Sequence, residues 1–284
     1  MGVSNSAYFA VNVVEDFLTA SKGRVSEATY RNYFHFSKKI KEALTAMNQL
    51  AVEAENYQPK HLSQLEGWVT KNNSAAYAQK VVTTMKQAFT FVSNSGKVNN
   101  LIGNYRSYSK SESKKVTFLS EIEVEKIRAF EGKTEQINFA RDFFLVQCYT
   151  GLAYIDLYQI SRESLVCRDK TSILNIKRHK TKSSCIIPVS QLALDLLNQY
   201  DFKFSRFHCA SINIYLKEIT KKVGIAKNIS THVGRKTFAT MLANRGVPAN
   251  TVAKILGHAS YSTTMKHYAE IQVDKVVGDV MGIL

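Results

Sequence analysis

Residues 230–246 read STHVGRKTFATMLANRG, and their pattern predicts one amphipathic helix with a histidine and an arginine in its first turn. A serine or threonine at its start and Gly246 at its end are suited to cap it. The macrodipole favours negative side chains at the N-terminus of a helix and makes that end attract anions. His232 and Arg235 are three residues apart on one face, so they could hold one phosphate-sized group. Capping and solvation also explain the pair, and the rest of the chain must decide.

The chain is basic along its whole length. Its 284 residues include 38 Lys and Arg against 23 Asp and Glu, which gives a formal net charge of +15. The sequence has 13 basic and 7 acidic residues up to position 110, and 25 basic and 16 acidic residues after it. A basic tail alone would not give this distribution, so we expect a polyanionic partner. A nucleic-acid duplex fits such a spread of charge, and other polyanions stay open as alternatives. Counterion release should make the binding strongly dependent on salt.

Several other classes of protein are disfavoured. The cysteines at positions 148, 167, 185 and 209 are far apart and lack zinc-ligand spacing, so we expect free thiols and no metal. The first residues lack a basic segment followed by a long apolar run, and no window reaches the length of a membrane span. We expect a cytoplasmic protein without a membrane partner. No phosphate-cradling glycine loop is present, so we expect no nucleotide cofactor.

Two domains are expected from the length and from a change in composition. The pattern from residue 8 to about residue 105 predicts four or five short helices in a small bundle. Residues 104–116, NYRSYSKSESKKV, are rich in Ser and Lys and are typical of an exposed linker. We place a helical domain at residues 1–108, a linker at 109–116 and a second domain at 117–284.

The second domain is predicted to be mainly helical with a small antiparallel β-hairpin. SILNIKRHK alternates between apolar and polar residues, KTKS predicts a turn, and SCIIPV predicts the returning strand. On that alternation Arg178 and Lys180 share one strand face, and His179 points to the other. Before the hairpin, RDFFLVQCYTGLAYIDLYQI predicts a buried helix, a glycine turn and a second helix. The fold expected for the chain is a helical bundle followed by a mainly α domain with a small β-hairpin.

Three further motifs carry polar residues. TGLAYIDL contains Asp156, which would most simply pair with a neighbouring cation. LGH places His258 just past the glycine that ends a helix. STTMKHYAEI contains Tyr268, which nothing local distinguishes from the other tyrosines. Each motif has an ordinary structural explanation, so it is their order along the chain that points to a function.

This order resembles the catalytic domain of the tyrosine recombinases, also called phage-type integrases. TGLxxxDL, a hairpin lysine before IIPVS, HxxR, LGH and TTxxxY follow one another between residues 117 and 271. The likeness is closest to the integrases of conjugative transposons. The helical domain is similar in pattern and length to the SAM-like core-site-binding domain of that family.

The resemblance implies a role for each motif residue. Tyr268 would be the nucleophile that forms a 3′-phosphotyrosyl link, with His232 as its base. Lys180 would protonate the departing 5′-oxygen. Arg235 and His258 would stabilise the phosphate, and Asp156 would support the site. The family chemistry needs neither a metal nor another cofactor.

Two departures from the family pattern affect these assignments. The first box usually reads TGLRxSEL, and here Ala153 stands at the position of its arginine. We expect Arg178 to supply the lost charge from the hairpin, because it should lie on the strand face of the catalytic lysine. Arg162 is the alternative, and its place beyond Asp156 favours the protein surface.

The second departure concerns the nucleophile. His258 and Tyr268 are ten positions apart where the common pattern has nine, so His267 falls at the usual place. Tyr268 remains the expected nucleophile, because the chemistry needs a hydroxyl that forms a stable phosphodiester-like link.

The resemblance implies site-specific recombination through a Holliday junction, which would integrate or excise a mobile element. The implied assembly is a tetramer on DNA, held by the C-terminal tail AEIQVDKVVGDVMGIL, with accessory DNA-bending proteins as further partners and a place on the nucleoid. The tail could instead pack on its own protomer. The alternatives are a type IB topoisomerase, a helix-turn-helix regulator, and a recombinase relative that has lost activity and only binds DNA.

Overall fold

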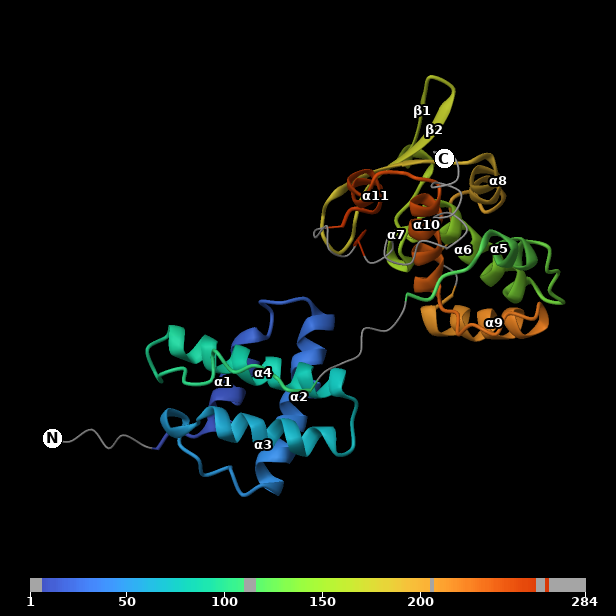
Figure 1. Cartoon of the computed structure of the whole chain (residues 1–284). Helices are drawn as coiled ribbons and strands as arrows, with labels where there is room; N and C mark the ends of the chain where they lie inside the picture. The colour runs from blue at the N-terminus through green and yellow to red at the C-terminus, as the bar shows by residue number, and fades with distance from the viewer. Residues whose placement is uncertain (1–6, 110–115, 205–206, 259–263, 266–284) are drawn as a thin grey trace, which may run out of the picture. The chain divides into compact units, whose positions relative to one another are not determined.

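The computed structural model describes residues 7–109, 116–204, 207–258 and 264–265 (Figure 1). The chain divides into two compact units, Met1–Ser113 and Lys114–Leu284, and each has a hydrophobic core of its own.

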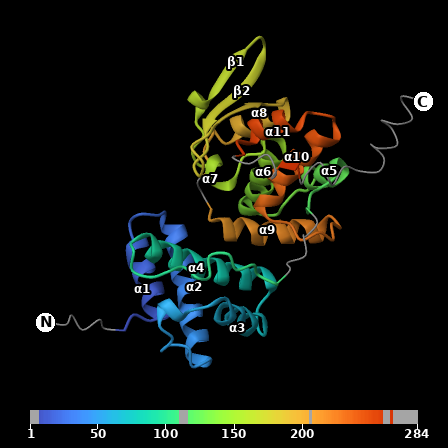
Figure 2. The same cartoon turned by 60° about the vertical axis from the view of Figure 1, so that its left-hand side comes forward.

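The N-terminal unit is a helical bundle. Its elements are α1 (Ala10–Ser21), α2 (Glu27–Ala46), the 3₁₀ turn η1 (Ala54–Asn56), α3 (Pro59–Thr70) and α4 (Ala75–Asn94). Ser26 and Ser74 begin α2 and α4, and their hydroxyls accept backbone N–H groups of the first turn. Helix α4 packs against α1, α2 and α3 and thus lies at the centre of the bundle (Figure 2). The rings of Tyr57 and Phe89 stack in the core at 5.2 Å, so these aromatic residues serve packing.

A buried carboxylate fixes the segment that follows the bundle. Glu66 on α3 is 0% exposed and accepts hydrogen bonds from the Tyr105 hydroxyl at 2.7 Å, the Ser109 N–H at 2.8 Å and the Ser107 hydroxyl. Lys86 Nζ donates to the Tyr105 carbonyl at 2.8 Å. The first part of the Ser- and Lys-rich segment is therefore bound to the bundle, because its polar groups satisfy one buried charge.

The C-terminal unit packs helices around α6 and carries a small sheet. Its elements are α5 (Glu121–Arg128), α6 (Glu135–Thr150), α7 (Tyr154–Leu157), η2 (Arg162–Ser164), β1 (Leu165–Arg168), β2 (Thr171–Lys177), β3 (Ser184–Pro188), α8 (Gln191–Gln199), α9 (Cys209–Lys222), α10 (Thr231–Asn244) and α11 (Ala249–Leu256). Helix α6 contacts α5, α8, α9 and α10, and it is buried on most of its surface. The predicted fold class, mainly α with a small antiparallel sheet, is confirmed.

The sheet is antiparallel with the order β1-β2-β3. Leu174 of β2 pairs with Ile187 of β3, and these two residues with Cys185 form its buried face. The sequence predicted β2 and β3 but missed β1, because three of the four residues of β1 are exposed and do not alternate. A tight turn joins β1 to β2 through Asp169 and Lys170, both with positive φ.

Two predicted helices differ in detail. The segment after Gly151 forms only one α-helical turn, α7, and then the 3₁₀ turn η2, rather than a full second helix. Helix α10 begins after Ser230 as expected, but the Ser230 side chain makes no capping bond, and Asn213 of α9 accepts the Thr231 N–H at 2.9 Å. Tertiary contacts at both places override the local pattern.

Helix α10 lies directly against α6 in both views (Figure 1, Figure 2). A methyl group at Gly234 would come within 2.8 Å of Gln147 Cβ, so only glycine permits this approach. The buried face of α10 is otherwise made mostly of small residues. This close contact holds the N-terminal turns of α10, with His232 and Arg235, beside the end of α6.

No helix among the described residues is both long enough and apolar enough to cross a membrane.

Candidate active site

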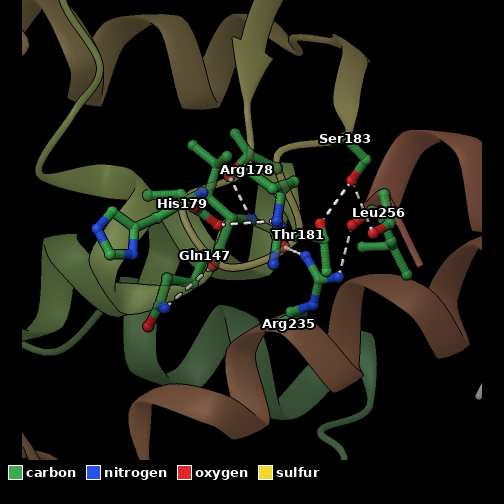
Figure 3. Close-up of polar contacts among 12 residues, drawn as sticks. Gln147, Arg178, His179, Thr181, Ser183, Arg235 and Leu256 are labelled. Atoms are coloured by element: carbon green, nitrogen blue, oxygen red, sulfur yellow. Dashed lines mark hydrogen bonds and ion pairs between the residues drawn. The ribbon is translucent and has the colours of Figure 1, made fainter. Parts of the chain in front are cut away.

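Arg235 is buried where two helices end. It is 6% exposed, and its terminal nitrogens donate to the carbonyl oxygens of Gly151 and Leu256, each at 2.6 Å (Figure 3). Leu256 is the last residue of α11, and Gly151 is the C-cap of α6. The last carbonyls of a helix have no intrahelical donor and carry partial negative charge. Arg235 therefore joins the TGL and LGH motifs to the HxxR helix by capping two helices at once.

Two glycines make this junction possible. Gly151 and Gly257 have φ values of 69° and 60°, in the left-handed region that a helix end needs. A methyl group at Gly151 would lie 2.6 Å from Leu256 Cδ2, and one at Gly257 would lie 2.4 Å from Cys185 Sγ. Any other residue at either position would add backbone strain to a steric clash.

Arg178 and Asp156 form a buried ion pair next to this junction. Arg178 Nε lies 3.0 Å from Asp156 Oδ2, and the residues are 9% and 2% exposed. The other carboxylate oxygen, Oδ1, accepts the His179 N–H at 2.8 Å. Arg178 Nη1 is buried and has no hydrogen-bond partner among the described residues. The expected pairing of Asp156 with a cation is confirmed, and the cation retains an unused donor.

The prediction that Arg178 and Lys180 share a strand face is wrong. Strand β2 ends at Lys177, and the chain then turns, with the Arg178 N–H donating to the Ser183 carbonyl at 2.9 Å. Arg178 is drawn inward to Asp156, whereas Lys180 is exposed in the turn. Figure 3 shows the Arg178 side chain close to that of Arg235, with the imidazole of His179 directed away from both. The alternation of residues along the strand could not predict this, because the carboxylate that draws Arg178 inward is distant in the sequence.

His232 lies in the first turn of α10. Although it is exposed, partial burial of the ring and then the charges of Lys236, Arg235 and Arg178 lower its pKa below the usual value. The imidazole is therefore neutral at neutral pH and able to accept a proton. Burial and the charge of Arg178 also lower the pKa of Arg235 to about 9, which leaves the guanidinium cationic.

His258 directly follows the glycine that ends α11. Its backbone N–H donates to the Ala253 carbonyl at 3.0 Å, and its Nδ1 lies 2.8 Å from the hydroxyl of Thr264. His258 therefore lies next to Gly257, at the junction that Arg235 and Arg178 contact. The predicted nucleophile Tyr268, its rival His267 and the tail at 269–284 lie outside the described residues.

The structure separates the two candidate replacements for the missing arginine. Arg162 is on the surface, where it pairs with Asp201 at 2.8 Å, as its position in the sequence suggested. Arg178 lies beside Arg235 and pairs with Asp156. Among the described residues, no group of three His, Cys, Asp or Glu side chains could hold a metal ion.

Sequence reasoning missed several residues of the site. The carbonyls of Gly151 and Leu256 anchor Arg235, and the Ser183 hydroxyl donates to the Gly257 carbonyl at 3.2 Å. Thr264 contacts His258. The glycine after each helix was the available signal, because a glycine-ended helix presents free carbonyls to any cation nearby.

The packing of α11 disfavours a helix-turn-helix regulator. A recognition helix presents polar side chains to base edges. Here Val252 and Leu256 are buried, and they pack with Ala239 of α10 in a small apolar cluster. Helix α11 has 8 residues, and its C-terminal end places Leu256 and Gly257 at the junction.

Comparison with known proteins identifies relatives of this chain. The sequence profile of the phage integrase family matches residues 117–275, which is more than half of the chain. A tyrosine recombinase of Pseudothermotoga lettingae is 25% identical over 231 residues, covering 76% of this chain and 78% of that protein. A tyrosine recombinase of Thermosipho africanus is 34% identical over 83 residues, which are 28% of this chain and only 29% of that protein.

Solved structures share the fold over nearly the whole chain. The integrase of transposon Tn1549 in complex with a circular-intermediate DNA has a TM-score of 0.76 and 14% identity, covering 98% of this chain and 100% of that one. A lambda integrase dimer bound to a core site has a TM-score of 0.72 and 18% identity, covering 90% and 94%. With the profile match, these results show that the chain belongs to the phage integrase family, among the tyrosine recombinases.

Proposed function

We propose that the protein is a site-specific DNA recombinase that cuts and rejoins strands through a 3′-phosphotyrosyl intermediate. One observation carries the proposal: two guanidinium groups, Arg235 and Arg178, are buried together at the junction of three sequence motifs. Burying two cations side by side is costly unless an anion or fixed dipoles compensate them. Asp156 and the two helix-end carbonyls offset part of that charge, and a DNA phosphate would supply the rest.

The guanidinium groups would stabilise the transition state. Negative charge accumulates on the non-bridging oxygens of a phosphodiester under attack, and fixed donors lower the barrier because they need no reorganisation. Arg178 Nη1 is such a donor, held by Asp156 through Nε. We therefore assign to Arg178 the charge that the family places at the position of Ala153. This assignment argues against a protein that only binds DNA.

The remaining groups would move protons. The Tyr268 hydroxyl attacks phosphorus and forms an O–P bond while the P–O5′ bond breaks, and His232 takes the phenolic proton. Lys180, exposed on the turn, gives a proton to the departing 5′-oxygen. Rejoining is the reverse, in which a 5′-hydroxyl of a second DNA attacks the phosphotyrosine and releases the tyrosine. The covalent link retains the energy of the broken bond.

Exchange of both strand pairs in this way proceeds through a Holliday junction. The similarity in fold to a transposon integrase and to lambda integrase supports integration or excision of a mobile element. Four protomers on two DNA sites are required for two successive exchanges, and we assign the contacts between protomers to the tail at 269–284.

The N-terminal unit would bind the core site. Helix α4 contains no acidic residue, and its solvent face forms one stripe of Lys80, Thr83, Gln87, Thr90 and Asn94. These residues line two open grooves, one of them shared with α2. Amide and hydroxyl groups of this kind read base edges, and lysine binds phosphate.

A nicked duplex tests the proposal, after a bound sequence has been selected from a random duplex library. Cleavage next to the nick releases a short fragment and traps the covalent adduct, which a denaturing gel detects. We expect an adduct with the wild-type protein and with His267→Phe, and none with Tyr268→Phe. Arg235→Ala should slow cleavage by about 10²–10³-fold, as for the loss of one fixed oxyanion donor. Wild-type rates in Arg235→Ala or an adduct in Tyr268→Phe would refute the mechanism.

A second readout separates recombination from the action of a type IB topoisomerase. Two differently labelled duplexes that carry the selected site should yield a recombinant strand. Relaxation of a supercoiled plasmid without any exchange between the duplexes would instead indicate a topoisomerase.

A further inference from the structure

The contact between His258 and Thr264 lies at the edge of the site and has no role in the mechanism above. The Thr264 hydroxyl is 2.8 Å from His258 Nδ1, and Thr264 is 0% exposed although the neighbouring Met265 is 42% exposed. A threonine buried in this way normally has a partner for its hydroxyl, and this one is aimed at an imidazole nitrogen.

The backbone of His258 is already fixed by other contacts. Gly257 is held in the left-handed region between Cys185 and Arg178, and its carbonyl accepts the Ser183 hydroxyl at 3.2 Å. The His258 N–H is bonded to the Ala253 carbonyl. The rotation of the imidazole and the nitrogen that carries its proton are set by contacts of the ring itself. The hydrogen bond between Nδ1 and the Thr264 hydroxyl fixes the rotation, and it places the ring hydrogen on Nε2 when the hydroxyl is the donor.

We infer that Thr264 is a positioning residue that orients the imidazole of His258 and selects its tautomer. The Thr264 hydroxyl donates to Nδ1, so the neutral ring carries its hydrogen on Nε2 and presents that N–H as a donor to the phosphate. This inference rests on the proposed function, because it gives His258 a phosphate to stabilise.

The place of Thr264 in the sequence adds a consequence. Thr264 precedes the proposed nucleophile Tyr268 by four residues. The hydroxyl that orients His258 therefore belongs to the stretch of chain that carries the nucleophile. A protomer in which residue 264 is displaced therefore has a misoriented histidine.

Single-turnover cleavage of the nicked duplex tests this inference with two substitutions at one position. Thr264→Val keeps the shape but removes the hydroxyl, and cleavage should become about tenfold slower, the effect of one hydrogen bond on a barrier. Thr264→Ser keeps the hydroxyl and should restore most of the rate. The DNA dissociation constant and the melting temperature should stay near wild type in both variants.

A double-mutant cycle separates this role from a merely structural one. In a His258→Ala background, Thr264→Val should have no further effect, because Thr264 acts only through the imidazole. Equal slowing in both backgrounds, or wild-type cleavage by Thr264→Val while His258→Ala is slow, would overturn the inference. Wild-type cleavage by His258→Ala would instead show that the assigned role of His258 in the proposed function is wrong.

The tautomer is measured without any substitution. Nitrogen-15 NMR of the full-length wild-type protein should show the neutral His258 ring protonated on Nε2. A ring protonated on Nδ1 would overturn the inference even if Thr264→Val failed to fold.

Discussion

Both units bury charged side chains whose hydrogen bonds are complete, and the C-terminal unit also buries one whose hydrogen bonds are not. In the N-terminal unit, three groups donate to the carboxylate of Glu66, so its two oxygens are both bonded. In the C-terminal unit, Asp142 is likewise paired with Arg141 at 2.7 Å and accepts the Tyr200 hydroxyl at 2.8 Å. Arg178 is also buried, at 9% exposed, yet its Nη1 has no hydrogen-bond partner among the described residues.

The difference distinguishes a structural charge from a functional one. A buried charge whose hydrogen bonds are complete holds elements together and has no capacity for a ligand. A buried charge that is fixed by some of its atoms and lacks a partner at another keeps a hydrogen-bonding group for a ligand. By this criterion Glu66 and Asp142 belong to the fold, whereas we assign Arg178 to the proposed site.

Substitution of Arg178 should have the largest effect. Arg178→Lys can keep the ion pair with Asp156, but a single ammonium cannot hold the carboxylate and also present a second directed donor. We expect single-turnover cleavage to fall by about 10²-fold or more, as for a lost oxyanion donor. Binding to the selected duplex should change little, because most of the phosphate contacts remain.

Arg162→Lys is the matched control for this substitution. Arg162 also pairs with an aspartate, Asp201, but its side chain is 62% exposed. Its replacement should leave cleavage at the wild-type rate, because exposed ion pairs contribute little. Equal rates for the two variants would show that Arg178 is as structural as Glu66.

Glu66→Gln should have the next largest effect, and on stability alone. The amide keeps the volume, but it loses the charge and turns an NH₂ group towards one of the donors. We expect the free energy of unfolding to fall by about 2–3 kcal/mol, the range for hydrogen bonds to a charged group. Urea denaturation measures this loss, and single-turnover cleavage with saturating DNA should be unchanged.

The pH dependence of stability gives a second test of the role of Glu66. Burial alone would raise the pKa of Glu66, but hydrogen bonds from Ser107, Ser109 and Tyr105 outweigh it and lower the pKa below the usual value. The stabilisation is therefore complete above the unfolded pKa and is lost as the pH falls through the folded one. Glu66→Gln should lack this acid-side loss. Glu15→Gln, which removes an exposed partner of Lys41, is the control and should behave like wild type.

The sequence predicted those parts of the fold that local rules determine. The capping box at Ser120, with its hydroxyl on the Glu123 N–H and Glu123 on the Ser120 N–H, starts α5 by such a local rule. The helix-ending glycines Gly151 and Gly257 were also recognised from the sequence. These signals depend on neighbours within a few residues, which is why one sequence was sufficient to find them.

What the sequence did not predict depends on distant partners. Arg178 leaves the strand pattern because Asp156, 22 positions earlier in the numbering, draws it inward. Residues 105–109 are typical of a linker by composition, but Glu66 binds them to α3. No local pattern contains such partners, so a buried charge recruits residues that composition assigns to loops.

The smallest effect is expected at Lys236, a charged residue that acts on the pKa of His232. Burial lowers the pKa of His232 first, and Lys236 is the largest of the charges that lower it further. If His232 accepts the proton of Tyr268, cleavage should slow as the pH falls through this lowered pKa. Lys236→Gln removes one repelling charge, so the acid limb should move to higher pH by a few tenths of a unit, as expected for a solvent-screened pair. Lys217→Gln, on the exposed face of α9, should leave the limb in place. A limb that moves to lower pH in Lys236→Gln, or equally in both variants, would assign the titration to another group and leave the base of the reaction outside α10.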